Sequence, residues 1–476
     1  MGERRSAAGS ARMDRLLTGP IVPTLLALAA PMILVLTVQA SINLVETHFI
    51  GALGTAPLAG AALVFPIVML MQMVAAGGLG GGIASAIARA LGAGQHDRAV
   101  GLIRHALALA TAAGLASTLL GLAGGPMIYR ALGGSGETLA AALDYSNTIF
   151  AGVLLLWWAN ALVSALRGSG QMLAPALVIL VSAVVAIALS PCLILGWGPF
   201  PRLGLVGAGL AVVSYHGLCV LGFLAALVFG PDGPSLRLPI RLERDLFADI
   251  LSVGGLSTVM TLQSSLAVVI VTGLAGGYGS LVLAGYGIGA RLDSLLVPPL
   301  FGLGAATVTM VGINIGAGQG RRAERITWLG VLIAALALEA IGLLVACYPK
   351  VWLGLFSDDG AVLKAGARYL RTVAPFYGFL GVGTILHFAG IGAGRARGPL
   401  CAISARVLVA AGGGLLVVHG LGGGPRQLYV MVAAGLVAFA GVNAAFVLNG
   451  SMSRPRHAVE PEPAAGVPRP AADRRP

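Results

Sequence analysis

Long apolar runs, separated by short polar segments, dominate this sequence. Each run has about 20 residues or more, the length of a helix that crosses a bilayer. A membrane β-barrel would instead show alternating segments of about ten residues. The runs therefore predict an all-α polytopic membrane protein with twelve transmembrane helices. Their approximate ranges are 21–49, 58–84, 101–129, 139–165, 173–196, 204–229, 247–272, 281–312, 326–348, 364–390, 399–419 and 428–449.

The balance of residue types supports a membrane location. The chain is 57% hydrophobic and 10% charged, whereas a soluble domain carries roughly 25% charged residues. Its 71 glycines would allow transmembrane helices to approach closely. The formal net charge of +12 does not indicate a nucleic-acid partner, because the arginines lie in short loops between apolar runs. The four cysteines have no paired spacing, so we expect neither disulfides nor a metal site.

The positions of lysine and arginine predict the orientation in the membrane. They concentrate in alternate loops, for example 89–104 and 321–325, whereas the loops 51–57 and 273–280 carry no charge. Basic loops stay on the cytoplasmic side. We therefore expect a multi-pass protein of the cell (inner) membrane with both termini in the cytoplasm, although the basic stretch 349–371 lies on the opposite side.

A long internal repeat divides the chain in two. LGAGQHDRA at 91–99 returns as IGAGQGRRA at 315–323, an offset of 316 − 92 = 224 residues. The same offset aligns Tyr145 with Tyr369, and an offset of 225 aligns Thr47 with Thr272. Six spans per half predict two parallel-repeat six-helix bundles, related by an axis along the membrane normal. Such repeats are typical of transporters that handle substrate at the interface between the halves.

The repeat also sets the predicted domain boundaries. We expect a polar, mobile cytoplasmic segment at 1–18, an N-lobe at 19–230, a C-lobe at 231–451 and a disordered cytoplasmic tail at 452–476. The GAGQ loops are interpreted as tight turns that need glycine and are anchored by arginines. A phosphate-binding loop is the alternative, but no Walker lysine follows either copy.

Several motifs resemble the MATE family of multidrug and toxic-compound extrusion antiporters. The resemblance covers about residues 20–450. It implies secondary active export, driven by a proton or sodium gradient, through V-shaped inward-open and outward-open states. The matching motifs are VETHFIGALGTAPLAG (45–60), ARALGAGQHDRA (88–99), ALRGSGQMLAP (165–175), LGLVGAGLA (203–211), LAGYGIGARL (283–292) and INIGAGQGRRA (313–323).

One face of the first span is polar. Gln39, Asn43 and Glu46 are spaced at i, i+4 and i+7, which places them on the same side of a helix. An acid inside a membrane span is costly and is by default a functional group. A structural need common to both halves does not explain this face, because the second half has other residues there: Ser264, Val268 and Val271.

The resemblance implies that the first-span acid belongs to an N-lobe cation site. The family usually has Asp there, and this chain has Glu46. The expected Asn and Asp of the fifth span are Ala186 and Ser190, and an expected Thr is Val212. Asn160 matches a polar position of the family and is interpreted as part of the site. Sodium needs several hard oxygen ligands, so we predict proton coupling at Glu46, with sodium less favoured and no cofactor.

Four further residues are candidates for the substrate cavity. They are Gln72, Met73, Gln263 and Asp293. Methionine suits promiscuous binding sites, and Gln263 corresponds to a seventh-span acid in another branch of the family. The roles of Arg291, Asp293 and Glu339 stay open. Arg291 and Asp293 are interpreted as packing or gating charges with other partners, and Glu339 is a weaker functional candidate, because its span is largely peripheral in the resembled fold.

Together these features predict a monomeric antiporter of amphipathic small molecules, with cationic substrates favoured. A lipid-linked oligosaccharide flippase of the same superfamily is one alternative. Such flippases usually have a cationic central cavity, and it is disfavoured here because Arg291 is the one clear mid-span arginine. An uncoupled carrier is a second alternative, because Ala186, Ser190 and Val212 depart from the family pattern. A membrane enzyme is disfavoured, because no acids or histidines cluster at useful spacing. The expected partners are the small-molecule substrate and the lipid bilayer.

Overall fold

The computed structural model describes residues 2–229 and 242–451, and within these ranges the side chains of residues 2–8, 37, 40–45 and 451 are not described. This part of the chain forms helices and no strands. The tail 452–476, predicted to be disordered, lies outside the described residues.

The first half of the chain begins with a short helix and continues with six spans. The spans are α2; the continuous series α3, η1 and α4; α5; the pair α6 and α7; α8; and α9. The bounds are α1 (Gly2–Thr18), α2 (Ile21–Gly51), α3 (Thr55–Met73), η1 (Val74–Leu79), α4 (Gly80–Gly92), α5 (His96–Ala131), α6 (Gly136–Ala151), α7 (Val153–Gly168), α8 (Leu173–Leu195) and α9 (Gly204–Phe229).

The second half repeats this order. Its spans are α10; α11; α12; the series α14, η2 and α15; the series from α16 to η4; and α18 with η5. The bounds are α10 (Arg244–Gly276), α11 (Ser280–Gly316), α12 (Gly320–Cys347), α13 (Pro349–Leu353), α14 (Gly360–Val373), η2 (Ala374–Phe376), α15 (Tyr377–Gly392), α16 (Arg397–Val407), η3 (Leu408–Gly412), α17 (Gly413–Leu415), η4 (Leu416–Gly420), α18 (Pro425–Phe446) and η5 (Val447–Ser451).

The number of spans agrees with the prediction. Within the described residues, ten helices or helix series are long and apolar enough to cross a membrane. The pair α6 and α7 is an eleventh span, bent by 48°. Helix α2 has 31 residues, more than the roughly 20 that a crossing requires, and is the twelfth. The prediction of twelve transmembrane helices is confirmed.

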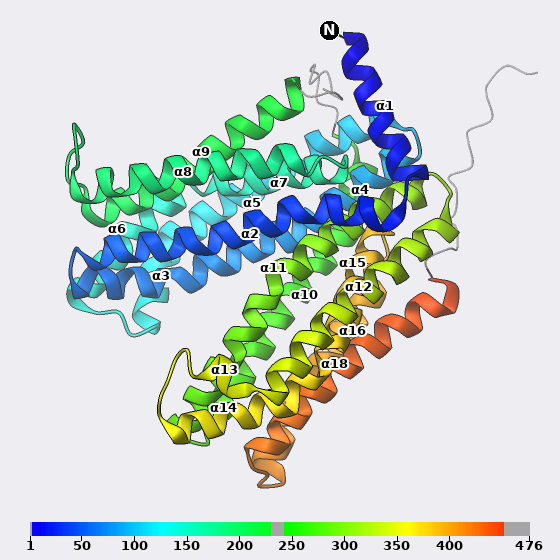
Figure 1. The fold of residues 1–476 in the computed structure, drawn as a ribbon. Coiled ribbons are helices and arrows are strands. Elements are labelled where there is room, and N and C mark those ends of the chain that lie inside the picture. Colours follow the sequence, from blue (N-terminus) through cyan, green and yellow to red (C-terminus); the bar gives the residue numbers. More distant parts are fainter. Residues whose placement is uncertain (1, 230–241, 452–476) are drawn as a thin grey trace, which may run out of the picture.

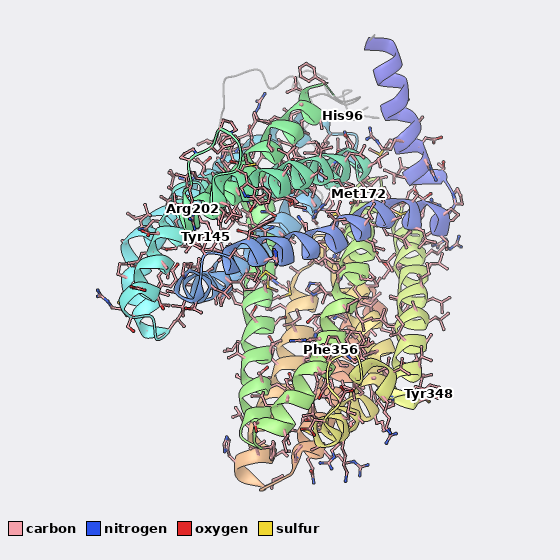
Figure 2. All side chains as sticks on the ribbon, turned by 60° about the vertical axis from the view of Figure 1, so that its left-hand side comes forward. His96, Tyr145, Met172, Arg202, Tyr348 and Phe356 are labelled. Carbon is pink, nitrogen blue, oxygen red and sulfur yellow. The ribbon has the colours of Figure 1, made fainter. Side chains whose placement is uncertain are left out.

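The two halves form the arms of a V (Figure 1). Helices α2 to α9 make one arm, helices α10 to α18 make the other, and the arms join at one end. In Figure 2, His96 and Met172 lie near the joined end, Tyr145 and Arg202 lie toward the far end of the N-lobe, and Phe356 lies toward the far end of the C-lobe. His96 directly follows the first GAGQ turn, so this turn belongs to the joined end.

The joined end is a crossing of two helix termini at backbone contact. A Cβ atom at Gly92, the end of α4, would lie 2.0 Å from the carbonyl oxygen of Ile313. A Cβ atom at Gly316, the end of α11, would lie 2.1 Å from the carbonyl oxygen of Arg89. Since 313 − 89 and 316 − 92 both equal 224, the two copies of the repeat contact each other across a local twofold axis. The repeated glycines are therefore required by this crossing.

Hydrogen bonds between the lobes follow the same symmetry. The hydroxyl of Ser85 on α4 donates to the carbonyl oxygen of Ile391 on α15. The hydroxyl of Thr309 on α11 donates to the carbonyl oxygen of Arg167 on α7, at 2.9 Å. Ser85 and Thr309 are fully buried, and both pairs are related by 224 residues. The joined end is thus a quasi-symmetric interface that the repeat encodes twice.

The turns themselves also repeat. Gly94 and Gly318 both have φ of +73°, a left-handed conformation that a residue with a Cβ atom adopts at an energetic cost. This geometry is consistent with the interpretation of the GAGQ loops as tight turns.

The N-terminal segment differs from our expectation of a mobile stretch. It forms helix α1, and the side chain of Leu16 in its last turn is only 2% exposed. The carbonyl oxygen of Leu16 accepts a hydrogen bond from Asn314 Nδ2 at 3.2 Å, and that of Gly19 accepts one from the Arg322 guanidinium. The segment is docked because the C-lobe supplies donors to carbonyl groups that a helix terminus leaves without partners.

The crossing predicts that Gly92→Ala destabilises the folded protein. The added methyl group would collide with the backbone of α11, and overpacking of this kind costs about 1–3 kcal/mol. We expect a lower apparent Tm of the purified protein in detergent, measured by size-exclusion chromatography after heating. Gly255→Ala is the control, because Gly255 lies in a helix with nothing within 4 Å of an added Cβ. Equal Tm values for both variants would contradict the assignment.

Candidate functional site

Glu46 is held by one tyrosine inside the N-lobe. It lies near the end of α2, and the hydroxyl of Tyr145 on α6 donates a hydrogen bond to its Oε1 at 3.0 Å. Tyr145 is 8% exposed and lies toward the far end of this lobe (Figure 2). Among the described side chains, no Lys, Arg or His forms an ion pair with Glu46. The carboxyl group therefore lacks a fixed cation that would keep it permanently ionised.

The other residues of the same helix face also contribute to the lobe. Gln39 Nε2 donates to the hydroxyl oxygen of Tyr215 on α9, at 3.0 Å. The side chain of Asn43 lies outside the described residues. Glu46 and Gln39 thus form hydrogen bonds with two different helices, α6 and α9. The inner side of α2 therefore carries polar contacts within the N-lobe.

Asn160 contacts a predicted cavity residue instead of Glu46. Its Nδ2 donates to Gln72 Oε1 at 3.4 Å and to the Leu156 carbonyl oxygen at 2.9 Å. Gln72 Nε2 lies 3.5 Å from Asn160 Oδ1. Asn160 is 6% exposed. These hydrogen bonds therefore join Asn160, which is predicted to belong to the coupling site, to Gln72, which is predicted to line the substrate cavity.

Met73 lies next to the junction of the lobes. It ends α3, and its side chain is 43% exposed. Five residues later, Gly78 is so close to Thr258 on α10 that an added Cβ would lie 2.5 Å from the threonine hydroxyl oxygen. Gln263, farther along α10, donates to the Ser404 hydroxyl on α16 at 3.2 Å. Gln72 and Met73 thus lie on the N-lobe side of the junction, and Gln263 lies on the C-lobe side.

Asp293 is the C-lobe counterpart of the Glu46 arrangement. It lies on α11 and accepts hydrogen bonds from the hydroxyls of Tyr369 on α14, at 2.6 Å, and Tyr377 on α15. Tyr369 is the repeat partner of Tyr145, since 369 − 145 = 224. Each lobe therefore holds one carboxyl group with the same repeated tyrosine. The two acids lie on spans that are not equivalent in the repeat, α2 and α11. The repeat alignment therefore identifies the two tyrosines as equivalent but does not predict which acids they bind.

Arg291 and Glu339 have separate contacts. The Arg291 guanidinium lies 5.4 Å from the centre of the Phe356 ring and is not a partner of Asp293 in the described contacts. Glu339 Oε2 on α12 accepts a hydrogen bond from the backbone N–H of Gly378 at 2.8 Å. Because Gly378 lies in the first turn of α15, Glu339 stabilises a helix N-terminus.

Arg406 is a second intramembrane arginine, which the sequence pattern did not predict. It lies on α16 within the eleventh span, and its guanidinium is 5.6 Å from the centre of the Phe439 ring. Arg291 is therefore not the sole arginine within a span. Arg406 packs against an aromatic ring inside the C-lobe bundle.

An ion pair closes one flank of the joined end. Arg89 on α4 contacts Asp249 on α10 at 2.6 Å, and Arg98 on α5 contacts the other oxygen of this carboxylate at 3.3 Å. The Arg89 and Asp249 side chains are 14% and 18% exposed. The repeat partner of Arg89 is Ile313, which is fully buried. The ion pair is therefore present on one flank of the junction only, because the related flank has Ile313 in place of Arg89.

Metal-ligand clusters are not found in the described part of the chain: no group of three or more His, Cys, Asp and Glu side chains could hold a metal ion. The chemistry that this arrangement offers is the binding and release of a proton, or of a cationic group, at single carboxyl groups.

Comparison with known proteins agrees with the two-half architecture. The MatE family model matches residues 31–192 and 257–414, one segment in each lobe. The FAD transporter of Shewanella oneidensis is 26% identical over 77% of this chain and 81% of its own length. A probable multidrug resistance protein NorM of Deinococcus radiodurans is 28% identical over 87% of this chain and 92% of its own length.

Solved structures share the fold. A MATE protein in a bent conformation superposes with a TM-score of 0.84 at 24% identity, covering 93% of this chain and 99% of its own. A MOP superfamily transporter from Pyrococcus furiosus gives a TM-score of 0.82 at 24% identity, covering 93% of this chain and 98% of its own.

The ion pair at the junction predicts energetic coupling between Arg89 and Asp249. Each single variant, Arg89→Gln or Asp249→Asn, leaves one charge without its main partner, so each should lower the apparent Tm. The double variant should lose less than the sum, because contacting residues couple by about 0.5–3 kcal/mol. Unfolding in detergent measures all four proteins. Additive losses would mean that the pair does not stabilise the junction.

Proposed function

Because this chain belongs to the MatE family of membrane transporters, whose family model spans both lobes, we propose that it exports amphipathic small molecules in exchange for protons. Members of this family are transporters and not enzymes, and they bind small-molecule substrates within the membrane. The proposal concerns the coupling ion, the class of substrate and the direction of transport.

The Tyr145–Glu46 hydrogen bond carries the proposal for the coupling ion. A carboxyl group inside a membrane span is stable when it is protonated or when it meets a cation. Since no described cation pairs with Glu46, a proton and a cationic substrate can occupy it in turn. Protonation from outside favours substrate release, and deprotonation toward the cytoplasm prepares the next cycle. Membrane potential contributes about 2.3 kcal/mol per charge for each 100 mV.

The chemistry of the lobes supports cationic substrates. Each lobe contains one tyrosine-bound acid, Glu46 or Asp293, and Met73 is exposed next to the junction. Acids attract cationic groups, and methionine adapts to different apolar shapes. Several relatives are described as probable multidrug resistance proteins. We propose that the protein works as a monomer, since one chain supplies both arms.

Export of an anionic dinucleotide is the second candidate function. The observation that favours it is the Shewanella oneidensis relative, which is described as an FAD transporter. Inside-out vesicles distinguish the two substrate classes. Uptake of ethidium without uptake of FAD supports the cationic class, and the reverse result supports the dinucleotide class. Proton and sodium gradients imposed separately identify the coupling ion.

We propose that the junction of the arms faces the cytoplasm of the cell, so that the arms open outward in the described state. The basic loops support this orientation, because both GAGQ turns with their arginines lie at the junction. Transport then requires an opposite state in which the Arg89–Asp249 contact is broken and the far ends of the arms approach each other.

Reporter fusions test this orientation. A reporter fused after residue 452 should give the signal of a cytoplasmic location. A reporter inserted in the uncharged loop at 273–280 should give the signal of an external location. The physical reason is the excess of arginine on the first side. Paired alkaline phosphatase and green fluorescent protein fusions give opposite signals on each side. The inverse pattern would contradict both the orientation and the outward-open assignment.

Glu46→Gln tests the coupling role. The substitution keeps the size and hydrogen-bonding shape of the side chain but removes the titratable proton. We expect normal insertion, retained substrate binding and loss of proton-driven export in vesicles. Glu46→Asp should keep part of the activity.

The matched control is Glu137→Gln, which removes an exposed carboxyl group from the first turn of α6. This variant should transport at the wild-type rate. If Glu46→Gln also transports at that rate under a proton gradient, Glu46 does not couple transport, and Asp293 becomes the acid to examine.

A further inference from the structure

The beginning of α12 carries an unusual outward face. Arg321, Arg325, Trp328 and Leu332 are spaced at i, i+4, i+7 and i+11, and all four are exposed. Trp328 and Leu332 are 38% and 53% exposed. Along the helix, this face changes from two cations to an aromatic ring and then to aliphatic side chains. That order matches the profile of one bilayer leaflet, from the headgroups through the interface to the acyl chains.

Two adjoining recesses lie along this face. The larger has a volume of about 930 Å³ and is lined by Arg321, Glu324 and Arg325, by Trp328, and by apolar residues down to Ala335, so two arginines outnumber one carboxylate at its polar end. The smaller has a volume of about 610 Å³ and lies between the second GAGQ turn, the start of α2 at Ile21, and the same two arginines. Arg321 and Arg325 therefore border both spaces.

The other half of the repeat shows that the shared fold does not require these cations. At the offset of 224, Arg321 and Arg325 correspond to Asp97 and Gly101, and Trp328 corresponds to Arg104. The arginine common to both turns serves the structure in each copy: Arg98 contacts Asp249, and Arg322 donates to the Gly19 carbonyl oxygen. Arg321 and Arg325 are additional to this shared contact.

At the equivalent place in the N-lobe copy, an apolar side chain packs against the helix. There, Leu246 of α10 packs so closely that an added Cβ at Gly101 would lie 2.9 Å from its Cδ1. At the upstream offset of 225, Leu246 corresponds to Ile21, which borders the recess beside Arg325. The flank that contains the Arg89–Asp249 pair is thus also packed at Gly101 by Leu246, whereas the related flank leaves a recess with a basic rim.

We propose that the face of α12 from Arg321 to Ala335 binds an anionic phospholipid of the leaflet that surrounds the joined end. The phosphate group would lie between the Arg321 and Arg325 guanidinium groups, and an acyl chain would follow Trp328 and Leu332. Arginine is well suited to phosphate because its planar donors match the oxygens. A soluble phosphate would use the arginines but not the apolar surface below them, which favours a lipid as the occupant.

Quenching of tryptophan fluorescence by brominated lipids tests the proposal. The purified protein is reconstituted in vesicles that contain brominated phosphatidylglycerol or brominated phosphatidylcholine. The difference between the wild type and Trp328→Phe isolates the signal of Trp328 from those of the other four tryptophans. We expect stronger quenching by the anionic lipid. Each arginine should contribute about five-fold to this preference, since one basic residue near an anionic surface contributes about 1 kcal/mol.

The single variants Arg321→Gln and Arg325→Gln and the double variant should reduce the preference stepwise. The matched control is Arg130→Gln with Arg371→Gln, which removes two exposed arginines elsewhere on the protein and should leave the preference unchanged. Added inorganic phosphate should also leave it unchanged.

Three results would each overturn the proposal. Equal quenching of Trp328 by both lipids would mean that the face does not select charge. A preference that survives in the single variants and in the double variant would mean that these arginines do not bind the headgroup. Loss of the preference upon addition of inorganic phosphate would mean that the ligand is a soluble anion and not a lipid.

Discussion

The backbone crossing of α4 and α11 is the contact on which the other features depend. Gly92 and Gly316 let two helix termini meet with no side chain between them, and lipid supplies no hydrophobic force that would hold the lobes together at a distance. Close packing and the paired hydrogen bonds of Ser85 and Thr309 provide the attraction instead. The arms diverge from this one junction (Figure 1), so any change in the angle between them requires movement at the junction.

The candidate functional residues lie at positions where the two halves of the repeat differ. The repeated tyrosines Tyr145 and Tyr369 bind acids supplied by different spans. One flank of the junction contains the Arg89–Asp249 pair, and the related flank has Ile313 in place of Arg89. The repeat supplies a stable scaffold in duplicate. Departures from it then identify positions whose chemistry the scaffold itself does not explain.

Much of the architecture was predictable because it depends on local patterns. Apolar length determines which segments can span a bilayer, and the offset of 224 residues identified two equivalent halves. The acid in the first span was found because its cost inside a membrane makes it conspicuous. The docking of the N-terminal segment was not predicted, because the hydrogen bond from Asn314 to the Leu16 carbonyl oxygen joins residues 298 positions apart.

The number of spans, their division into two lobes and the intramembrane acid Glu46 follow from residue type and spacing along the chain alone. The hydrogen-bond partners follow only from the folded arrangement: Tyr145 binds Glu46, Tyr369 binds Asp293, and Asn160 contacts Gln72. The physical reason is that a hydrogen bond in a helical bundle depends on the rotation and crossing of neighbouring helices. Those quantities are fixed by packing across the whole lobe and leave no periodic signal within any one span.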